Sequence, residues 1–159
     1  MSFKFADLFA GIGGFHAALT KHGGKSVFVS EIDQSARNVY ARNWLQGEEA
    51  SISGDITKLT SGDVRVATHN VLTGGFPCQP FSKSGSQRGV AEARGTLFYD
   101  ILRIVETKQP ELILLENVRN LIGPKHISDY KVMIRLIREL GYVVSDEPTI
   151  LSPMKFLSI

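Results

Sequence analysis

Hydrophobic residues along the chain fall into short, nearly continuous runs that alternate with stretches of helical spacing. The runs predict β-strands, and the clearest of them are residues 3–9, 26–30, 70–73 and 111–115. A regular alternation of strands and helices is typical of an open, mostly parallel sheet with helices on its faces. The sequence therefore predicts the α/β fold class, with residues 1–159 in one domain.

Two weaker strands and four helices complete this pattern. Short apolar runs at 51–53 and 142–145 predict the two additional strands, and residues 15–21 predict the first helix. The other three helices are defined by apolar residues at helical spacing: Ala36, Val39, Tyr40 and Trp44; Leu97, Ile101, Leu102 and Val105; and Tyr130, Met133, Ile134, Ile137 and Leu140.

Polar residues and a glycine indicate where two of these helices begin and end. Asp33 precedes the second helix and is a residue type that caps helix N-termini. Ser128 or Asp129 is expected to cap the last helix, which Gly141 is expected to end.

Composition and charge narrow the class of protein. The chain is 43% hydrophobic, and its net charge of +2 is too small to indicate nucleic-acid binding by itself. A single cysteine excludes an internal disulfide and suits a reducing cytoplasm. No apolar run reaches the roughly 18 residues of a membrane helix, and the N-terminus lacks the layout of a signal peptide. We therefore expect a cytoplasmic protein.

A glycine-rich turn, residues 10–14, connects the first predicted strand to the first predicted helix. Glycines let backbone approach a ligand closely, and a helix N-terminus offers free N–H groups. Because position 16 is His, the spacing is not that of a dinucleotide-binding motif, so a pyrophosphate is not indicated. The turn alone is a weak signal, since many tight strand-to-helix connections contain glycine.

Acidic residues follow three of the predicted strands. Glu31 can accept hydrogen bonds from both hydroxyls of a ribose. Asp55 could accept from an adenine amino group, with Ile56 packing on the ring, or it could equally be a turn residue or helix cap. Glu116 ends a strand expected to be buried, where a carboxylate is costly without a partner or a task. The alternative for Glu116 is a cap of the following turn.

The only cysteine, Cys78, lies between two prolines just beyond the strand predicted at residues 70–73. Proline restricts its own backbone and that of the preceding residue, so the thiol is expected on a stiff turn. A thiol presented in this way suggests a nucleophile. A small buried hydrophobe is the alternative, but the flanking prolines and glycines are poor core material.

Residues 83–95 show no core face and predict a loop that closes over a substrate. A plain surface linker is the alternative.

With these motifs in view, the chain resembles the cytosine-C5 DNA methyltransferases. Residues 7–15, DLFAGIGGF, look like the family's first cofactor motif, and residues 75–82, GFPCQPFS, look like its highly specific nucleophile motif. Residues 94–98 and 116–118 match two further motifs. The resemblance runs from Phe3 to about Phe156.

The resemblance implies an open, mostly parallel Rossmann-like sheet that binds S-adenosyl-L-methionine (SAM) as methyl donor, and it implies no metal. Cys78 would attack C6 of a flipped cytosine, and Glu116 would support ring N3. The residues implied to bind the cofactor are Phe9, Ala10, Gly11, Gly13, Gly14, Glu31, Ile32, Asp55, Ile56, Pro77 and Leu97. Those implied to face double-stranded DNA are Gln79, Ser82, Ser84 and Arg88.

The chain departs from the family pattern near its end. After Phe156 the family continues with a Gly and a Pro-Gln-x-Arg-x-Arg segment, whereas this chain has Leu157-Ser158-Ile159. The target recognition domain and the last SAM motif are also absent, so the sheet is expected to be C-terminally incomplete. We expect the N-terminal half of an enzyme that needs a complementary C-terminal chain or self-associates. The alternatives are an inactive SAM-binding or partner-binding fragment and a tRNA cytosine-5 methyltransferase, although the Gly-Gly-Phe before Pro77 looks more like the bacterial DNA enzymes.

Overall fold

The structure is a computed structural model that describes residues 2–61, 63–77 and 96–152. The chain divides into two compact units, Met1–Asn117 and Val118–Ile159. Each unit is described separately below.

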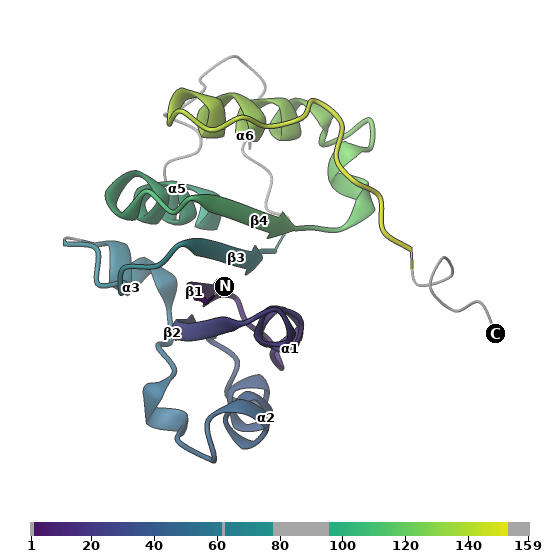
Figure 1. Ribbon diagram of the computed structural model, residues 1–159. Helices are drawn as coiled ribbons and strands as arrows, with labels where there is room; N and C mark the ends of the chain where they lie inside the picture. The colour runs from purple at the N-terminus through teal and green to yellow at the C-terminus, as the bar shows by residue number, and fades with distance from the viewer. Residues whose placement is uncertain (1, 62, 78–95, 153–159) are drawn as a thin grey trace. The chain divides into compact units, whose positions relative to one another are not determined.

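The first unit contains a parallel four-stranded sheet with the order β2-β1-β3-β4 (Figure 1). Its strands are β1 (Phe3–Leu8), β2 (Gly24–Ser30), β3 (Val71–Gly75) and β4 (Leu112–Glu116). Every pair of neighbouring strands is parallel, as the alternation of strands and helices predicted. The predicted open α/β sheet is therefore confirmed.

The register of the sheet places the carboxyl ends of all four strands level with one another. Leu8 of β1 pairs with Ser30 of β2 on one side and with Gly74 of β3 on the other. Gly74 in turn pairs with Leu115 of β4. Residues that follow these positions therefore emerge along one edge of the sheet, where ligands of open α/β sheets bind.

Four helices are described in this unit: α1 (Gly14–Lys21), α2 (Gln34–Trp44), α3 (Ile56–Thr60) and α5 (Leu97–Lys108), with a 3-10 turn, η1 (Glu49–Ser51). The cap predicted for α2 is confirmed, because the Asp33 carboxylate accepts a hydrogen bond from the backbone N–H of Ala36 at 2.7 Å. Thr96 caps α5 in the same way through the N–H of Tyr99.

The core of this unit forms around β1, which is bonded to a strand on each side. Phe5, Ala6, Asp7 and Leu8 are completely buried. One cluster of buried residues joins the glycine turn, β2 and α2; its members are Ala10, Val29, Tyr40, Ala41 and Ile52, with Trp44 and Leu45 packed against them. The core of this unit therefore centres on β1, one of the strands that the hydrophobic runs predicted.

Two predictions about strands in this unit need correction. Residues 51–53 do not form a strand; a 3-10 turn ends at Ser51, and the only pairing there is a single parallel bridge from Ser53 to Ser30. Ile52 N–H bonds back to Glu49 O within the turn, so only Ser53 forms backbone bonds with the β2 region. β4 was predicted to be buried, yet Leu112 and Leu114 are 56% and 45% exposed. β4 lies at the end of the described strand order, and its side chains alternate between faces.

The second unit contains a 3-10 turn, η2 (Arg119–Ile122), and one helix, α6 (Ile127–Glu139). The cap predicted at Ser128 or Asp129 is wrong, because both residues lie inside the first turn of α6, and His126 precedes it without a side-chain cap. The predicted end of the helix is confirmed, since Gly141 has a φ of 92° and its N–H bonds to Arg138 O.

The strand predicted at residues 142–145 is also wrong. This segment carries no strand pairing in the described part of the chain, and Val143 is fully exposed. The Arg138 side chain of α6 binds this segment instead. It donates a hydrogen bond to Val144 O at 2.5 Å and forms an ion pair with Asp146 at 3.0 Å. An apolar run of this length predicts a strand only when another strand is available to pair with it.

Candidate functional site

The glycine turn after β1 adopts a backbone conformation that few residue types allow. Phe9, Gly11 and Gly13 have positive φ values of 53°, 55° and 95°. Two backbone hydrogen bonds hold the turn, from Ala10 N–H to Ser30 O at 3.0 Å and from Gly13 N–H to Ala10 O at 2.9 Å. A non-glycine residue such as Phe9 in the left-handed region is strained, and such strain often occurs at binding sites.

Open space lies beside this turn. A Cβ atom added to Gly11 or Gly14 would meet no other atom within 4 Å. Gly14 begins α1, whose N-terminus has no side-chain cap. Both features leave room for a ligand against the backbone.

The carboxylate of Glu31 connects the end of β2 to the glycine turn. Its Oε2 accepts a hydrogen bond from Gly11 N–H, and its Oε1 accepts one from Asp33 N–H, each at 2.8 Å. Each carboxylate oxygen can accept more than one hydrogen bond, so Glu31 retains acceptor capacity for a ligand. The structure thus brings together Gly11 and Glu31, which were predicted separately.

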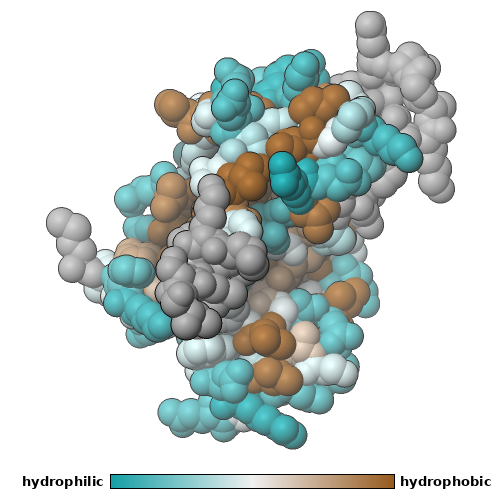
Figure 2. All heavy atoms as spheres, turned by 90° about the vertical axis from the view of Figure 1, so that its right-hand side faces the viewer, coloured by the Kyte–Doolittle hydropathy of each residue, from teal (hydrophilic) through white to brown (hydrophobic). Residues whose placement is uncertain are grey.

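Apolar side chains are exposed beside this carboxylate. Ile32 and Ile12 are 69% and 61% exposed. Figure 2 views the side toward which the β3 and β4 arrows point in Figure 1, and hydrophobic patches interrupt the hydrophilic surface there. A fixed carboxylate next to exposed apolar side chains suits a ligand with a polar sugar and an apolar ring.

Asp55 lies close to this region because Glu31 N–H donates to Ser53 O at 2.8 Å. Its Oδ1 accepts from both the N–H and the hydroxyl of Thr57, at 2.9 and 2.7 Å. These bonds cap α3 and lower the pKa of Asp55 below its ordinary value. The capping alternative is therefore present in the structure. Ile56 is buried, with only 4% of its surface exposed.

The ends of β3 and β4 approach each other closely at Gly75. Gly75 pairs with Glu116, and a Cβ added to Gly75 would lie 3.2 Å from Oε2 of that glutamate. Glycine here allows the carboxylate to lie over the strand end. The expectation of a buried carboxylate is wrong, however, because Glu116 is exposed. The argument from the cost of burial therefore does not apply to this residue.

The chain entering the predicted nucleophile loop is held in place from two sides. Asn117 donates from Nδ2 to Phe76 O at 2.8 Å. The Phe76 side chain is buried and lies 5.6 Å, between ring centroids, from Phe98 of α5. Pro77 follows and is exposed, and Leu97 is the first residue of α5. The backbone is thus fixed up to the residue before Cys78.

The remaining predicted site residues lie outside the described part of the chain. They are Cys78, Gln79, Ser82, Ser84 and Arg88, together with the predicted loop 83–95.

Asp7 is a buried charged residue near the end of β1 to which the sequence assigned no separate role. It is completely buried in β1, and Thr73 opposite it in β3 donates to its Oδ1 at 2.8 Å. Its Oδ2 is buried without a hydrogen-bond partner in the structure. Burial raises the pKa of Asp7 to about 7; the Thr73 hydrogen bond lowers it and the charge of Glu31 raises it further. The available signal was an acidic residue inside a predicted strand.

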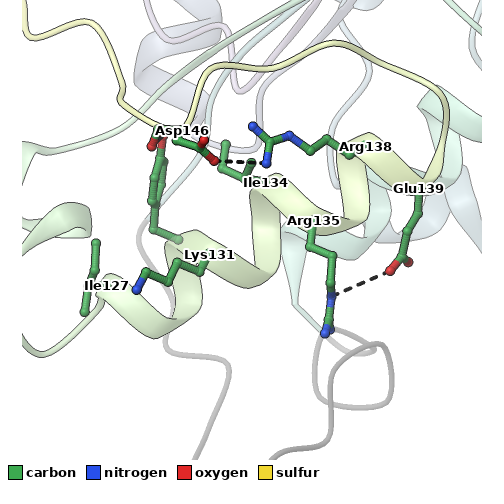
Figure 3. A pocket seen from close by; sticks show the side chains of 8 residues that line it. Ile127, Lys131, Ile134, Arg135, Arg138, Glu139 and Asp146 are labelled. Carbon is green, nitrogen blue, oxygen red and sulfur yellow. Dashed lines mark hydrogen bonds and ion pairs between the residues drawn. The ribbon is translucent and has the colours of Figure 1, made fainter.

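Figure 3 shows a groove in the second unit, along α6. Its volume is about 620 Å³, and it is lined by Ile127, Tyr130, Lys131, Ile134, Arg135, Arg138, Glu139 and Asp146. Two of its arginines form ion pairs, Arg138 with Asp146 at 3.0 Å and Arg135 with Glu139 at 3.6 Å. None of the residues predicted from the sequence to form the site lines this groove.

No helix among the described residues is long and apolar enough to cross a membrane. No group of three or more His, Cys, Asp or Glu side chains in the described part of the chain could hold a metal ion.

Comparison with known proteins defines the class to which this fold and site belong. Residues 3–156 match the family described as C-5 cytosine-specific DNA methylase. Because the match covers nearly the whole sequence, the chain belongs to this family.

Individual relatives show the same relationship over part of their length. The chain is 51% identical over 155 residues to the type II methyltransferase M.AluI of Cellulosimicrobium cellulans, covering 95% of this chain and 29% of that protein. It is 42% identical to M.HhaI of Haemophilus parahaemolyticus, covering 87% of this chain and 41% of that protein. The structure of the S. pombe Dnmt2 methyltransferase matches with a TM-score of 0.58 and 26% identity, covering 84% of this chain and 41% of that one. The chain thus spans well under half the length of these relatives.

The raised pKa of Asp7 leads to a prediction about pH-dependent stability. Because the folded-state pKa lies above the ordinary 3.8, Asp7 lowers the free energy of unfolding as pH rises from about 4 to about 7. Between pH 5 and pH 8 we expect the loss to be roughly 2–3 kcal/mol. Asp7→Asn should remove this component, which urea unfolding of both proteins at the two pH values would measure. Titrating histidines are common to both proteins, so their effect cancels in the comparison. Identical pH dependence in the two proteins would contradict the assignment.

Proposed function

We propose that this chain forms the SAM-binding and nucleophile-bearing part of a DNA (cytosine-5)-methyltransferase. One observation supports the proposal most directly. The glycine turn, Glu31 and Glu116 all lie at the carboxyl ends of the strands, which the register of the sheet aligns with one another. Membership in the cytosine-specific DNA methylase family supports the choice of DNA as substrate.

The residues around the glycine turn fit the parts of SAM, which when bound supplies an electrophilic methyl group. Gly11, Gly13 and Gly14, together with Phe9 and Ala10, would receive its amino-acid portion against open backbone. Glu31 would accept hydrogen bonds from the ribose hydroxyls, and the exposed Ile32 would contact the adenine.

Four further residues were also assigned to the cofactor. Asp55 would accept from the adenine amino group through Oδ2, because Thr57 occupies its Oδ1. Pro77 and Leu97 would complete the pocket from the ends of β3 and α5. Ile56, also assigned to the adenine, has a side chain that is buried in the core.

The proposed chemistry uses two side chains of this chain on the cytosine ring. A thiolate from Cys78 would add to C6, which makes C5 enamine-like and therefore nucleophilic. Glu116, as a carboxylic acid at ring N3, would offset the charge that develops on addition. When C5 takes the methyl group of SAM, S-adenosyl-L-homocysteine is left, and a base would then remove the C5 proton as the Cys78 sulfur is expelled, which restores the aromatic ring. The cytosine must leave the duplex to be reached, and Gln79, Ser82, Ser84 and Arg88 would face the DNA.

Activity of the complete protein would require more than these residues. The relatives extend well beyond the region matched here, since the chain covers 29% of one and 41% of another. We propose that a C-terminal region, in the same or in a second chain, or self-association, completes the enzyme and reads the DNA sequence. A fragment that binds SAM without catalysing transfer is the alternative. Similarity to enzymes named type II methyltransferases favours DNA over tRNA as the substrate.

The nucleophile assignment is tested by Cys78→Ser in the protein completed by a C-terminal methyltransferase region. We expect methyl transfer to fall below detection, because a hydroxyl yields almost no anion at neutral pH, whereas a thiol with pKa about 8.5 needs only modest lowering. A tritiated-methyl assay on duplex DNA measures this. Methylation at a near-normal rate would overturn the assignment.

The cofactor assignment is tested by Glu31→Ala in the 159-residue chain. Loss of a charged hydrogen-bonding group should weaken SAM binding by roughly 1.5–3 kcal/mol, measured by isothermal titration calorimetry. Glu106→Ala is the matched control, because Glu106 is exposed on α5. Equal SAM affinity in wild type and Glu31→Ala would count against the role of Glu31. No measurable binding by the wild-type chain would count against the proposed function itself.

A further inference from the structure

The glycine turn is contacted from outside by a residue that none of the family motifs includes. Trp44, the last residue of α2, donates a hydrogen bond from its indole Nε1 to the backbone oxygen of Ile12 at 3.0 Å. It is also the only tryptophan in the chain. A side chain far along the sequence thus bonds to the centre of the turn.

This hydrogen bond fixes one peptide group completely. The oxygen of Ile12 and the N–H of Gly13 belong to the same planar peptide unit. Trp44 binds the oxygen, and Ala10 O accepts from the Gly13 N–H at 2.9 Å. Because both ends of the plane are held, its orientation at the start of α1 is set.

The indole ring also explains why position 13 must be glycine. A Cβ atom added to Gly13 would lie 2.1 Å from Nε1 of Trp44, which is far inside van der Waals contact. Gly13 has a φ of 95°, which is already unfavourable for other residues. The ring and the turn therefore fit together only with glycine at this position.

A second set of aromatic contacts holds the indole in place. The His16 ring stacks on Trp44 with centroids 4.8 Å apart and planes at 21°. His16 Nδ1 lies 2.6 Å from the hydroxyl of Tyr40, and Phe5 packs edge-on against the same imidazole at 5.4 Å. His16 and Tyr40 are buried, and burial lowers the pKa of His16, which keeps the stacked ring neutral at neutral pH.

From these contacts we propose that Trp44 is a positioning residue for the cofactor. It holds the Ile12–Gly13 peptide group in the orientation that the turn presents to SAM, without touching SAM itself. This inference rests on the proposed function, because it concerns the same binding site.

The test is Trp44→Phe, which keeps an aromatic ring against His16 but removes the N–H donor. We expect the dissociation constant for SAM to rise roughly threefold to tenfold, as for loss of one hydrogen bond. Backbone amides of residues 10–14 should exchange hydrogen faster, while those of β3 (Val71–Gly75) keep their wild-type rates. Val39→Ala is the control on the same helix, because Val39 is 40% exposed and should change neither measurement.

A measurement on the wild-type chain needs no variant. The indole N–H of the single tryptophan should exchange slowly with solvent in an NMR experiment, because it is bonded to Ile12 O. Exchange as fast as that of free indole would overturn the inference, even if Trp44→Phe proves too unstable to study.

The outcomes separate this inference from the proposed function. If wild type binds SAM and Trp44→Phe binds equally well with unchanged exchange in the turn, the positioning role is wrong. Faster exchange across β3 as well would indicate a general loss of stability and would also overturn it. If wild type does not bind SAM, the proposed function fails, whereas the exchange rates of the turn still decide whether Trp44 holds it.

Discussion

Parallel pairing of β1 with a strand on each side is the constraint on which the rest of the structure depends. Leu8 is in register with Ser30 and Gly74, so the chain leaves three strands at the same level. The glycine turn, Glu31 and the chain leading to Cys78 all begin there. A shift of one residue in either pairing would turn the side chains of a strand to the opposite face. The positions of the site residues relative to one another therefore depend first on the register of the strands, and only then on the individual side chains.

Hydrogen bonds from the backbone then fix the side chains at this edge. Glu31 illustrates the principle, because its two carboxylate oxygens are bonded to N–H groups on either side, at Gly11 and Asp33. Such a carboxylate is oriented before any ligand arrives, which reduces the entropy lost on binding. Asp55 is held in a similar way by Thr57. The charge of Glu31 also contributes to the raised pKa of Asp7, which is buried in β1.

The sequence was sufficient to predict those features that depend on local patterns. The apolar run of β1, the glycine turn and the cap at Asp33 are each specified by neighbouring residues, and the structure confirms them. The segments 51–53 and 142–145 were misread as strands, because strand formation depends on a partner far along the chain. The exposure of Glu116 could not be predicted for the same reason.

Contacts between distant residues account for what the sequence could not reveal at the site. Thr73 lies opposite Asp7, and Trp44 reaches Ile12, only because the sheet and α2 bring them together. Without that arrangement, Asp7 is a charged residue in a strand and Trp44 is an aromatic residue at the end of a helix. Neither residue type at its position indicates the contact that the structure shows.

The central claim is that the carboxyl edge of the sheet in the first unit is a SAM site. The most direct measurement is NMR titration of the isotope-labelled chain with S-adenosyl-L-homocysteine, the product of methyl transfer. The account predicts that the largest amide shift changes lie in residues 9–14, 31–32 and 55–56. Saturable changes centred on the groove along α6, or no saturable changes at all, would contradict it.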